Sequence, residues 1–446
     1  MKKKDTFFVG LMLFSMFFGA GNLIFPPFLG LGAGTSFWPA ITGFILTGVG
    51  LPLLVLVAIV LVNDANTLGN RVHPWFGTSF TVVVYLAIGP LFAIPRNANV
   101  AYEMGVEPFL GNLSVSQPLL LLGFSVVFFL LVYLLSLNTS KVVDYMGRFI
   151  SPILLLSIVV LCVAGFFVLN KPLEAPTDTY QSASLFKGFV DGYSTMDALA
   201  SLAFGIAILT ALKQRGLTDK KQLTAYTLKT GLIAGAALAL VYVIIGLLGA
   251  KMAGYGTFDN GTAILSSAAT LVLGSGGTVL LGVIFTLACF TTCVGLTIAC
   301  GQYFSKLLPN LSYRMVVTAV TVVSFSLTNL GLNQIISVSV PFLVMAYPLL
   351  IVLVTLAFLH RFFGGAQKVY AGAMLLTGLV SLYDGLKMFG LKMHVLDTLM
   401  GSLPLTSVGL GWVVPALAGG LAGFVFDKLT RRPSAENQNY KLEKAS

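Results

Sequence analysis

Long apolar runs, repeated along almost the whole chain, constrain its fold more than any other feature of the sequence. A helix crosses the hydrocarbon core of a bilayer, roughly 30 Å thick, in about 20 residues. Runs of that length predict spans at 6–30, 36–62, 75–95, 117–137, 146–169, 187–212, 224–249, 275–304, 313–330, 334–359, 369–389 and 404–427. Mean hydropathy is +0.93, which a water-soluble core could not accommodate. We therefore expect an all-α membrane protein with twelve transmembrane helices.

Lysine and arginine are divided unevenly between the two sides that alternating spans define. If the N-terminus is inside, the cytoplasmic segments hold most of the 26 basic residues. Cytoplasmic loops of membrane proteins carry such an excess. We therefore predict a multi-pass protein of a bacterial-type cell (plasma) membrane, with both termini in the cytoplasm. Residues 431–446 are predicted to form a polar cytoplasmic tail.

Several classes of function find no support in the sequence. The net charge of +10 does not indicate nucleic acid, because the basic residues sit in short loops between spans. The chain has no GxxxxGK[ST] phosphate loop and no HExxH or GxSxG motif. We therefore expect no enzyme activity, no cofactor, no direct use of ATP and no obligate protein partner beyond the lipid bilayer itself.

The first predicted span is interrupted by FFGAGNLIFPP, residues 17–27. Gly19 and Gly21 bring almost no side-chain bulk, and Asn22 adds a donor and an acceptor. The double proline that follows lacks the N–H groups that a continuing helix needs. Backbone groups freed in hydrocarbon are tolerable only where they line a cavity or face other protein. The break is therefore either part of a binding site or a proline kink with tight glycine packing.

The sixth predicted span has a similar interruption in DGYSTMDALASLAFG, residues 191–205. An odd number of spans per repeat would invert the second half relative to the first. Interrupted helices at matching positions of two halves are typical of secondary transporters, which bind substrate between them. We expect one transporter domain over 1–430, with repeat one at about 6–169, repeat two at about 187–359 and two extra helices at about 369–427.

Two charged residues lie in or beside the predicted spans. Asp197, in the sixth span, is either a ligand for a cation or ammonium group, or a gating group, or a helix cap. Arg96 follows the third span in GPLFAIPRNANVAYE, where two prolines are expected to end the helix. Arg96 would form an outer gate with Glu103 or Glu107, or extend to the membrane interface as a solvated side chain. The sequence favours the solvated arrangement.

The eighth predicted span carries two adjacent hydroxyl groups. Thr291 and Thr292 follow Ala288 by three and four residues. A helix carbonyl at i and hydroxyls at i+3 and i+4 can present three oxygens to one small hard cation such as Na⁺. The alternative is that each threonine bonds the carbonyl of the preceding turn, which is common in membrane helices.

Four motifs give the chain a resemblance to a known family: FFGAGNLIFPP, GPLFAIPR, GYSTMDALASLAFG and LACFTTCVGLT. They resemble the branched-chain amino acid:cation symporters, the LIVCS or BrnQ-type carriers of the amino acid–polyamine–organocation superfamily. The resemblance extends over essentially the whole chain. It implies a LeuT-like 5+5 inverted repeat with broken helices 1 and 6. It also implies uptake of leucine, isoleucine and valine by alternating access, driven by Na⁺ or H⁺.

The resemblance further implies where ligands bind. In the superfamily, substrate lies between the breaks of spans 1 and 6, which here correspond to Gly19, Ala20, Gly21, Asn22, Tyr193, Ser194, Thr195 and Met196. In its sodium-coupled members, the ion lies between span 1 carbonyls and span 8 hydroxyls, which here correspond to Ser15, Phe18, Ala288, Thr291 and Thr292. Asp197 and Arg96 become candidates for gating or ion coupling.

Other functions are separated from this hypothesis to different degrees. A channel would show rings of charge or a repeated filter sequence, and we find neither in the sequence. A carrier of the same fold for a nucleobase, a compatible solute or another amino acid is excluded only by the family resemblance.

Overall fold

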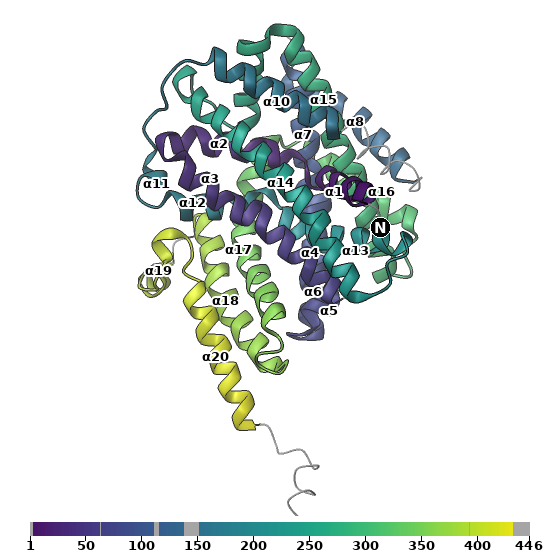
Figure 1. The fold of residues 1–446 in the computed structure, drawn as a ribbon, viewed down its shortest axis with the longest axis vertical. Coiled ribbons are helices and arrows are strands. Elements are labelled where there is room, and N and C mark those ends of the chain that lie inside the picture. The colour runs from purple at the N-terminus through teal and green to yellow at the C-terminus, as the bar shows by residue number, and fades with distance from the viewer. Residues whose placement is uncertain (1–2, 63, 111–115, 138–150, 392, 431–446) are drawn as a thin grey trace, which may run out of the picture.

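The computed structural model describes residues 3–62, 64–110, 116–137, 151–391 and 393–430, and helices dominate all of these ranges (Figure 1). The helices of the first half are α1 (Lys3–Phe17), α2 (Ala20–Ala33), α3 (Phe37–Ile45), α4 (Leu51–Val62), α5 (Ala65–Asn70), α6 (Pro74–Leu86), α7 (Ala93–Gly105), α8 (Gln117–Ser136) and α10 (Ser151–Val168). The expected all-α fold is confirmed for the described residues. The predicted tail at 431–446 lies outside them.

The second half is also helical in the described residues. Its helices are α11 (Asp178–Gln181), α12 (Ser184–Asp191), α13 (Asp197–Gln214), α14 (Lys220–Met252), α15 (Gly261–Leu307), α16 (Tyr313–Thr328), α17 (Leu332–Leu359), α18 (Gln367–Met388), α19 (His394–Gly401) and α20 (Val413–Thr430). By length and composition, nine helices of the described chain can cross a membrane, or up to ten if the bent pair α12 and α13 is one span. Shorter apolar helices at Asp5–Phe17, Leu155–Val168 and Tyr313–Thr328 fall outside that count.

The first predicted span is broken, but the prolines do not break it. α1 ends at Phe17 and α2 begins at Ala20, with Gly19 extended between them (φ −140°, ψ −163°). Pro26 and Pro27 both lie inside α2. Each proline removes one helical hydrogen bond, and membrane helices tolerate this where neighbouring groups compensate for the loss. The interruption is therefore made by the glycine that precedes α2.

The sixth predicted span is broken by a different backbone conformation. α12 passes into a 3₁₀ turn at Gly192–Thr195, and Met196 then adopts a left-handed conformation (φ 66°, ψ 4°). The helices on either side are bent by 48°. A left-handed residue other than glycine costs on the order of 1–3 kcal/mol and persists only where its surroundings hold it. Met196 is buried, so close packing surrounds this strained residue.

The third predicted span is broken at Gly89, beside Pro90, as expected, but the helical path then resumes. α6 runs into a π-helical turn at Ala87–Leu91, which is kinked at Gly89, and α7 then extends the helical path to Gly105. Pro95 lies in the first turn of α7, where the missing N–H has no helical partner to lose. The expected helix end at Pro95 is therefore wrong. Arg96 lies inside the protein on the first turns of α7.

The two broken spans pack on reciprocal partners. α1 and α2 both lie along α14, whereas α12 lies along α3 and α13 along α4. The first broken span thus packs on the helix that follows the second, and the second packs on the helices that follow the first. α7 packs on α15. α18 packs on both α17 and α20, and α18 and α20 lie at the end of the molecule opposite α8 and α10 (Figure 1).

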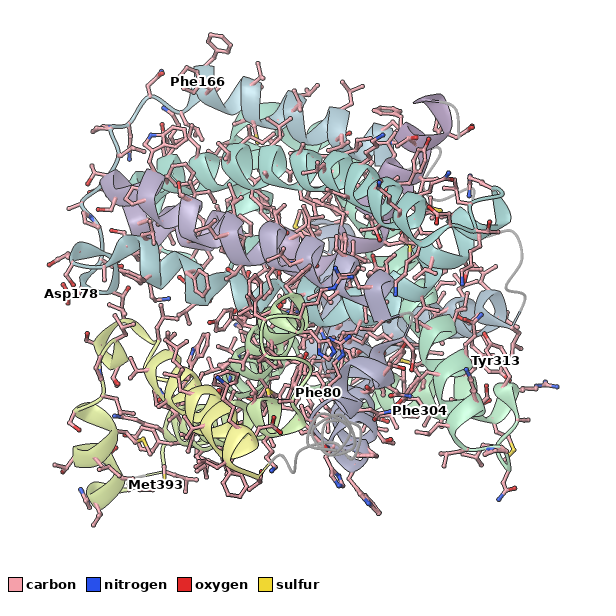
Figure 2. All side chains as sticks on the ribbon, turned by 60° about the horizontal axis from the view of Figure 1, so that its bottom comes forward. Phe80, Phe166, Asp178, Phe304, Tyr313 and Met393 are labelled. Atoms are coloured by element: carbon pink, nitrogen blue, oxygen red, sulfur yellow. The ribbon has the colours of Figure 1, made fainter. Side chains whose placement is uncertain are left out.

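The contact between α2 and α14 brings backbone against backbone. A Cβ atom at Gly30 would lie 1.8 Å from the carbonyl oxygen of Gly246, and one at Gly249 would lie 2.0 Å from that of Pro27. Only glycine permits this approach. Elsewhere side chains fill the space between the helices, and apolar groups such as Phe166 face outward at the periphery (Figure 2).

Candidate functional site

A buried carboxylate joins the two broken spans. Asp197, the first residue of α13, is 3% exposed. Its Oδ2 accepts hydrogen bonds from Asn22 Nδ2 at 2.7 Å and from the Tyr242 hydroxyl at 3.0 Å. Asn22 also contacts the Tyr242 hydroxyl. Asp197 is not the helix cap, since Met196 occupies that position, so the capping interpretation is wrong. The carboxylate instead connects α2, α13 and α14.

Asparagine side chains accept hydrogen bonds from the backbone amides of the first break. Asn22 Oδ1 accepts a hydrogen bond from the amide of Gly19 at 2.9 Å, which is half of a capping box. Asn97 Oδ1 accepts one from the amide of Ala20 at 2.8 Å. Asn97 belongs to α7, directly after Arg96. The donors at the start of α2 are thus held by the protein's own side chains.

The Arg96 guanidinium donates hydrogen bonds to backbone carbonyls of the second break. Its Nη1 donates to the carbonyl oxygen of Ser194 at 2.9 Å, and its Nη2 donates to that of Thr195 at 3.3 Å. The side chain is 1% exposed and lies over the ring of Phe25. The expectation of a solvated Arg96 at the membrane interface is therefore wrong, because α7 continues through this position and buries it against the sixth span.

The alternative of an outer gate with a glutamate is also unsupported. Among the described residues no ion pair joins Arg96 to Glu103 or Glu107. Glu103 instead accepts a hydrogen bond from Thr262, near the start of α15.

A small cavity lies between the two breaks. Its volume is about 30 Å³, roughly the share of one water molecule in the liquid. Six of the eight expected substrate residues line it, and they are Gly19, Ala20, Gly21, Asn22, Thr195 and Met196. Ser194 contributes its carbonyl to Arg96, and Tyr193 stacks on Tyr347 with 4.6 Å between ring centroids. Most polar groups that line the cavity are hydrogen-bonded to one another, but the Nε atom of Arg96 has no hydrogen-bond partner.

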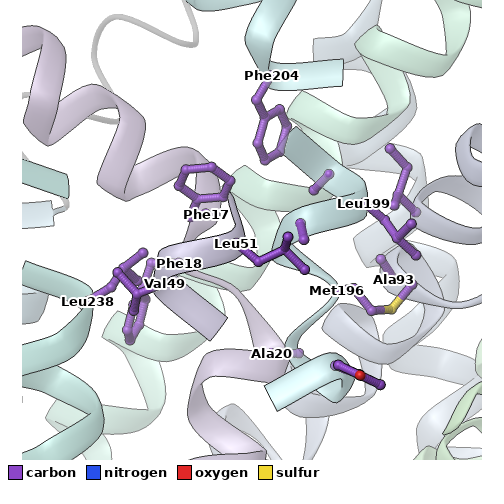
Figure 3. Close-up of a cluster of buried hydrophobic side chains, with 14 of the residues drawn as sticks. Phe17, Phe18, Ala20, Val49, Leu51, Ala93, Met196, Leu199, Phe204 and Leu238 are labelled. Carbon is purple, nitrogen blue, oxygen red and sulfur yellow. The ribbon is translucent and has the colours of Figure 1, made fainter. Parts of the chain in front are cut away.

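A much larger vestibule reaches the same region from one side. Its volume is about 730 Å³, which is within the usual range of ligand pockets. Exposed Gln302 and Lys306 line its outer part, while Met16, Phe204 and Thr292 line both the vestibule and the small cavity. Phe204 and Phe17 meet edge to face at 5.5 Å, and Figure 3 shows both rings near Met196 and Ala93 in one buried cluster.

The candidate sodium ligands lie at the inner end of this vestibule. The Thr292 hydroxyl is 3.2 Å from the Phe18 carbonyl oxygen and 3.1 Å from that of Ala288. The Thr291 hydroxyl is 2.7 Å from the Ala288 carbonyl oxygen. Ser15 lines the vestibule with both threonines. The structure therefore brings carbonyl and hydroxyl oxygens of α1 and α15 together, while each threonine also makes the hydrogen bond to the preceding turn that the alternative interpretation expects.

Two residues at the centre of the site were absent from the sequence-based predictions. Asn97 belongs to the polar run Arg96–Asn99, and asparagines inside a continuing membrane helix would have drawn attention to it. Tyr242 lies in the apolar run of α14, and nothing in its sequence context marks it. Its role follows only from the contact of α14 with α2 and α13.

Apolar helices packed around two broken helices that meet at a buried polar site have the architecture of secondary transporters. A sequence model described as a branched-chain amino acid transport protein matches residues 2–430. The chain therefore belongs to the branched-chain amino acid transport protein family, a family of transporters rather than enzymes, as its motifs predict.

Relatives from several bacteria match over nearly their full length. The branched-chain amino acid permease BraB of Bacillus subtilis (strain 168) is 47% identical, over 95% of this chain and 95% of the relative. The branched-chain amino acid transport system 2 carrier protein of Pseudomonas aeruginosa is 43% identical, over 97% and 98%. The permease BrnQ of Escherichia coli (strain K12) is 38% identical, also over 97% and 98%.

Solved structures of LeuT-fold transporters share the fold at low identity. MHP1, a nucleobase-cation-symport-1 family transporter solved in a closed conformation with bromovinylhydantoin, has a TM-score of 0.63 at 15% identity, over 97% of this chain and 95% of that one. MhsT in complex with L-phenylalanine has a TM-score of 0.55 at 14% identity, over 93% and 98%. These similarities concern the fold alone.

Proposed function

We propose that this protein takes up leucine, isoleucine and valine by cation symport through alternating access. Family membership supports the substrate class, since the relatives above are named as branched-chain amino acid permeases or carriers. One observation supports the mechanism above all. The two breaks meet at Asp197 and Asn22 between α2, α13 and α14, so a ligand bound there would contact both halves of the chain.

The proposed architecture has twelve spans, with the first ten arranged as an inverted repeat. The reciprocal packing of α1 and α2 on α14, and of α12 and α13 on α3 and α4, supports this arrangement. α18 and α20 would lie outside the repeat, with α18 against α17 and α20 against α18. The excess of basic residues on one side supports cytoplasmic termini in a bacterial cell membrane.

The substrate would bind between the breaks, where donors and acceptors are separated. Gly19 and Ala20, at the first break, line the small cavity together with Thr195, and the carbonyls of Ser194 and Thr195 accept from Arg96, which also lines it. Phe17, Phe204 and Met196 supply apolar surface beside them. An apolar pocket separates side chains that differ by one methylene by only about 1–3 kcal/mol. One carrier for all three branched-chain amino acids is therefore physically reasonable.

Sodium is the coupling ion that the arrangement favours, with the proton as the alternative. The carbonyls of Phe18 and Ala288 and the hydroxyls of Thr291 and Thr292 would hold Na⁺, with Ser15 nearby. An ion there would tie α1 to α15. It would drive transport only if its affinity differs between the inward-open and outward-open states. If protons drive transport, Asp197 is the buried carboxylate closest to the substrate.

The vestibule indicates which state this structure represents. Gln302 and Lys306 at its outer part belong to the end of α15, which the distribution of basic residues assigns to the cytoplasm. The structure would then be inward-open. Asp197 and Arg96 would gate or couple the site as it opens to either side.

Uptake of labelled amino acids into proteoliposomes tests the proposal. An inward Na⁺ gradient and an inward H⁺ gradient are imposed separately, and unlabelled hydantoin and phenylalanine serve as competitors. We expect concentrative leucine uptake with the Na⁺ gradient, inhibited by isoleucine and valine and not by either competitor. Uptake with the H⁺ gradient alone would make the proton, not Na⁺, the coupling ion. Strong competition by hydantoin or phenylalanine would overturn the assignment of branched-chain substrates. Uptake that only equilibrates leucine across the membrane would indicate a channel.

A further inference from the structure

Arg96 has more hydrogen-bonding capacity than its surroundings satisfy. Its two Nη atoms donate to the carbonyls of Ser194 and Thr195, but its buried Nε has no hydrogen-bond partner. Among the described residues it forms no ion pair. The Asp197 carboxylate interacts with the Arg96 charge only from beyond ion-pair distance. It is held there by its hydrogen bonds to Asn22 and Tyr242. A guanidinium buried in this way is costly unless a bound anion approaches it.

The cavity brings that guanidinium next to the first break. Arg96, Gly21 and Thr195 all line it. A Cβ atom at Gly21 would lie 2.7 Å from Arg96 Nη2 and 2.8 Å from the Thr195 carbonyl oxygen. The guanidinium is thus held between the backbones of the two breaks. A molecule entering from the vestibule would meet the guanidinium and the carbonyls together.

A zwitterion can supply a partner for the guanidinium and for the carbonyls at once. An ammonium group needs carbonyl acceptors, and those of Ser194 and Thr195 are taken by Arg96. A carboxylate needs a cationic donor, and guanidinium binds carboxylates through two parallel hydrogen bonds. An amino acid that displaces Arg96 from the carbonyls therefore brings a new partner for it.

We propose that Arg96 binds the substrate carboxylate, and that without substrate it occupies the place of the substrate ammonium. This inference rests on the proposed function. It makes Arg96, rather than the backbone amides near Gly19, the principal ligand of the substrate carboxylate. Those amides already donate to Asn22 and Asn97. Amines without a carboxylate are rejected because they leave the displaced guanidinium buried and unpaired.

The test compares ligands that differ in the carboxylate alone. Leucine, leucinamide and 3-methylbutylamine all carry an ammonium and the same branched tail. Their affinities for the wild-type protein and for Arg96→Gln are measured by isothermal titration calorimetry in detergent. We expect the wild type to bind leucine about 10- to 100-fold more tightly than leucinamide. In Arg96→Gln we expect that ratio to fall close to one, through weaker binding of leucine.

The outcomes separate this inference from the proposed function. If Arg96→Gln loses leucine and leucinamide binding equally, Arg96 only stabilises the structure of the sixth span, and the inference is overturned. A wild type that binds no branched-chain amino acid would instead overturn the proposed function. If Arg96→Gln is not monodisperse in detergent, Arg96→Met replaces it. Methionine has neither the charge nor an N–H donor, so a leucine-to-leucinamide ratio that stays at the wild-type value would then overturn the inference.

Discussion

The two helix breaks turn different backbone groups toward the site: N–H groups at the first break and C=O groups at the second. At the first, an extended Gly19 leaves amides pointing into the site, and side-chain oxygens of Asn22 and Asn97 accept from them. At the second, a 3₁₀ turn and a left-handed Met196 turn carbonyls inward, and Arg96 donates to them. One break therefore offers donors and the other acceptors. In the inferred binding mode the acceptors of the second break receive the substrate ammonium, while Arg96, rather than the amides of the first break, binds the carboxylate.

The breaks also differ in what holds them. The first depends on a residue without a side chain, and the second depends on packing around a residue whose conformation is unfavourable. Asp197 links the two through Asn22. The first break therefore depends on the freedom of one glycine, whereas the second depends on the residues packed around Met196.

Breaking that link is expected to have the largest effect. Asp197→Asn removes the carboxylate that accepts from Asn22 and Tyr242, and it leaves Arg96 without the balancing charge. Removing one member of a buried charged set costs about 3–5 kcal/mol. We expect the rate of leucine uptake into proteoliposomes to fall at least about 100-fold.

Asp191→Asn is the matched control for that substitution. Asp191 ends α12 close to the same break, but it is partly exposed and pairs with Lys187. A partly exposed ion pair contributes about 0–1 kcal/mol, so uptake should stay within a few-fold of wild type. Equal rates for the two variants would show that Asp197 does not join the breaks functionally.

Filling the space between the breaks is expected to have the next largest effect. In Gly21→Ala, the new methyl group would lie within 3 Å of Arg96 Nη2 and of the Thr195 carbonyl oxygen. Overpacking of this kind costs about 1–3 kcal/mol, and we expect leucine affinity to fall about 10-fold or more. The measurement is a titration of leucine binding in detergent.

Gly123→Ala controls for the general effect of adding a methyl group to a membrane helix. A Cβ atom at Gly123, in α8, would meet nothing within 4 Å. Its binding of leucine should equal that of the wild type. A Gly21→Ala protein with unchanged affinity would mean that substrate does not enter between the two breaks.

The smallest of the three effects concerns the ion that would fix α1 against α15. Thr292→Val keeps the shape of the side chain but removes the hydroxyl near the Phe18 carbonyl. Loss of one such oxygen is expected to raise the Na⁺ concentration for half-maximal leucine uptake about 5- to 10-fold, equivalent to about 1 kcal/mol. Uptake is measured across a series of Na⁺ concentrations at fixed leucine.

Thr297→Val provides the comparison within the same helix. The Thr297 hydroxyl is buried in α15 and has no hydrogen-bond partner. Its removal should leave the Na⁺ dependence unchanged. If Thr292→Val behaves like Thr297→Val, the assignment of sodium to this position is wrong.

The sequence predicted the helical class, the two breaks and the family, because long apolar runs and glycine-rich interruptions are local features. It was right that a glycine interrupts the first span, but wrong to add the double proline, since proline disfavours a helix in isolation but is tolerated in α2 inside a packed membrane protein. It also misplaced Arg96. A polar run after an apolar one resembles a membrane interface, and only the continuation of α7 past Pro95 shows that the run is buried.

The partners of Asp197 were beyond what a single sequence can supply. Asn22 and Asp197 lie 175 residues apart, and Tyr242 lies 45 residues beyond Asp197. Their contact depends on how α2, α13 and α14 meet, and no local pattern encodes that. The polar types of Asn22 and Asp197 were visible in the sequence, but their connection was not.

The close approach of α2 to α14 makes the site mechanically asymmetric. Backbone meets backbone at Gly30 and Gly249, so neither helix can slide along the other without a clash. α1 meets the same helix at Gly10, where a Cβ atom would lie 2.7 Å from Ile233 Cγ2 and 3.2 Å from the Thr230 carbonyl oxygen. If the protein alternates between two open states, as proposed, we expect opening toward the vestibule to tilt the segment before Gly19. We expect opening toward the opposite face to move α2 and α14 together.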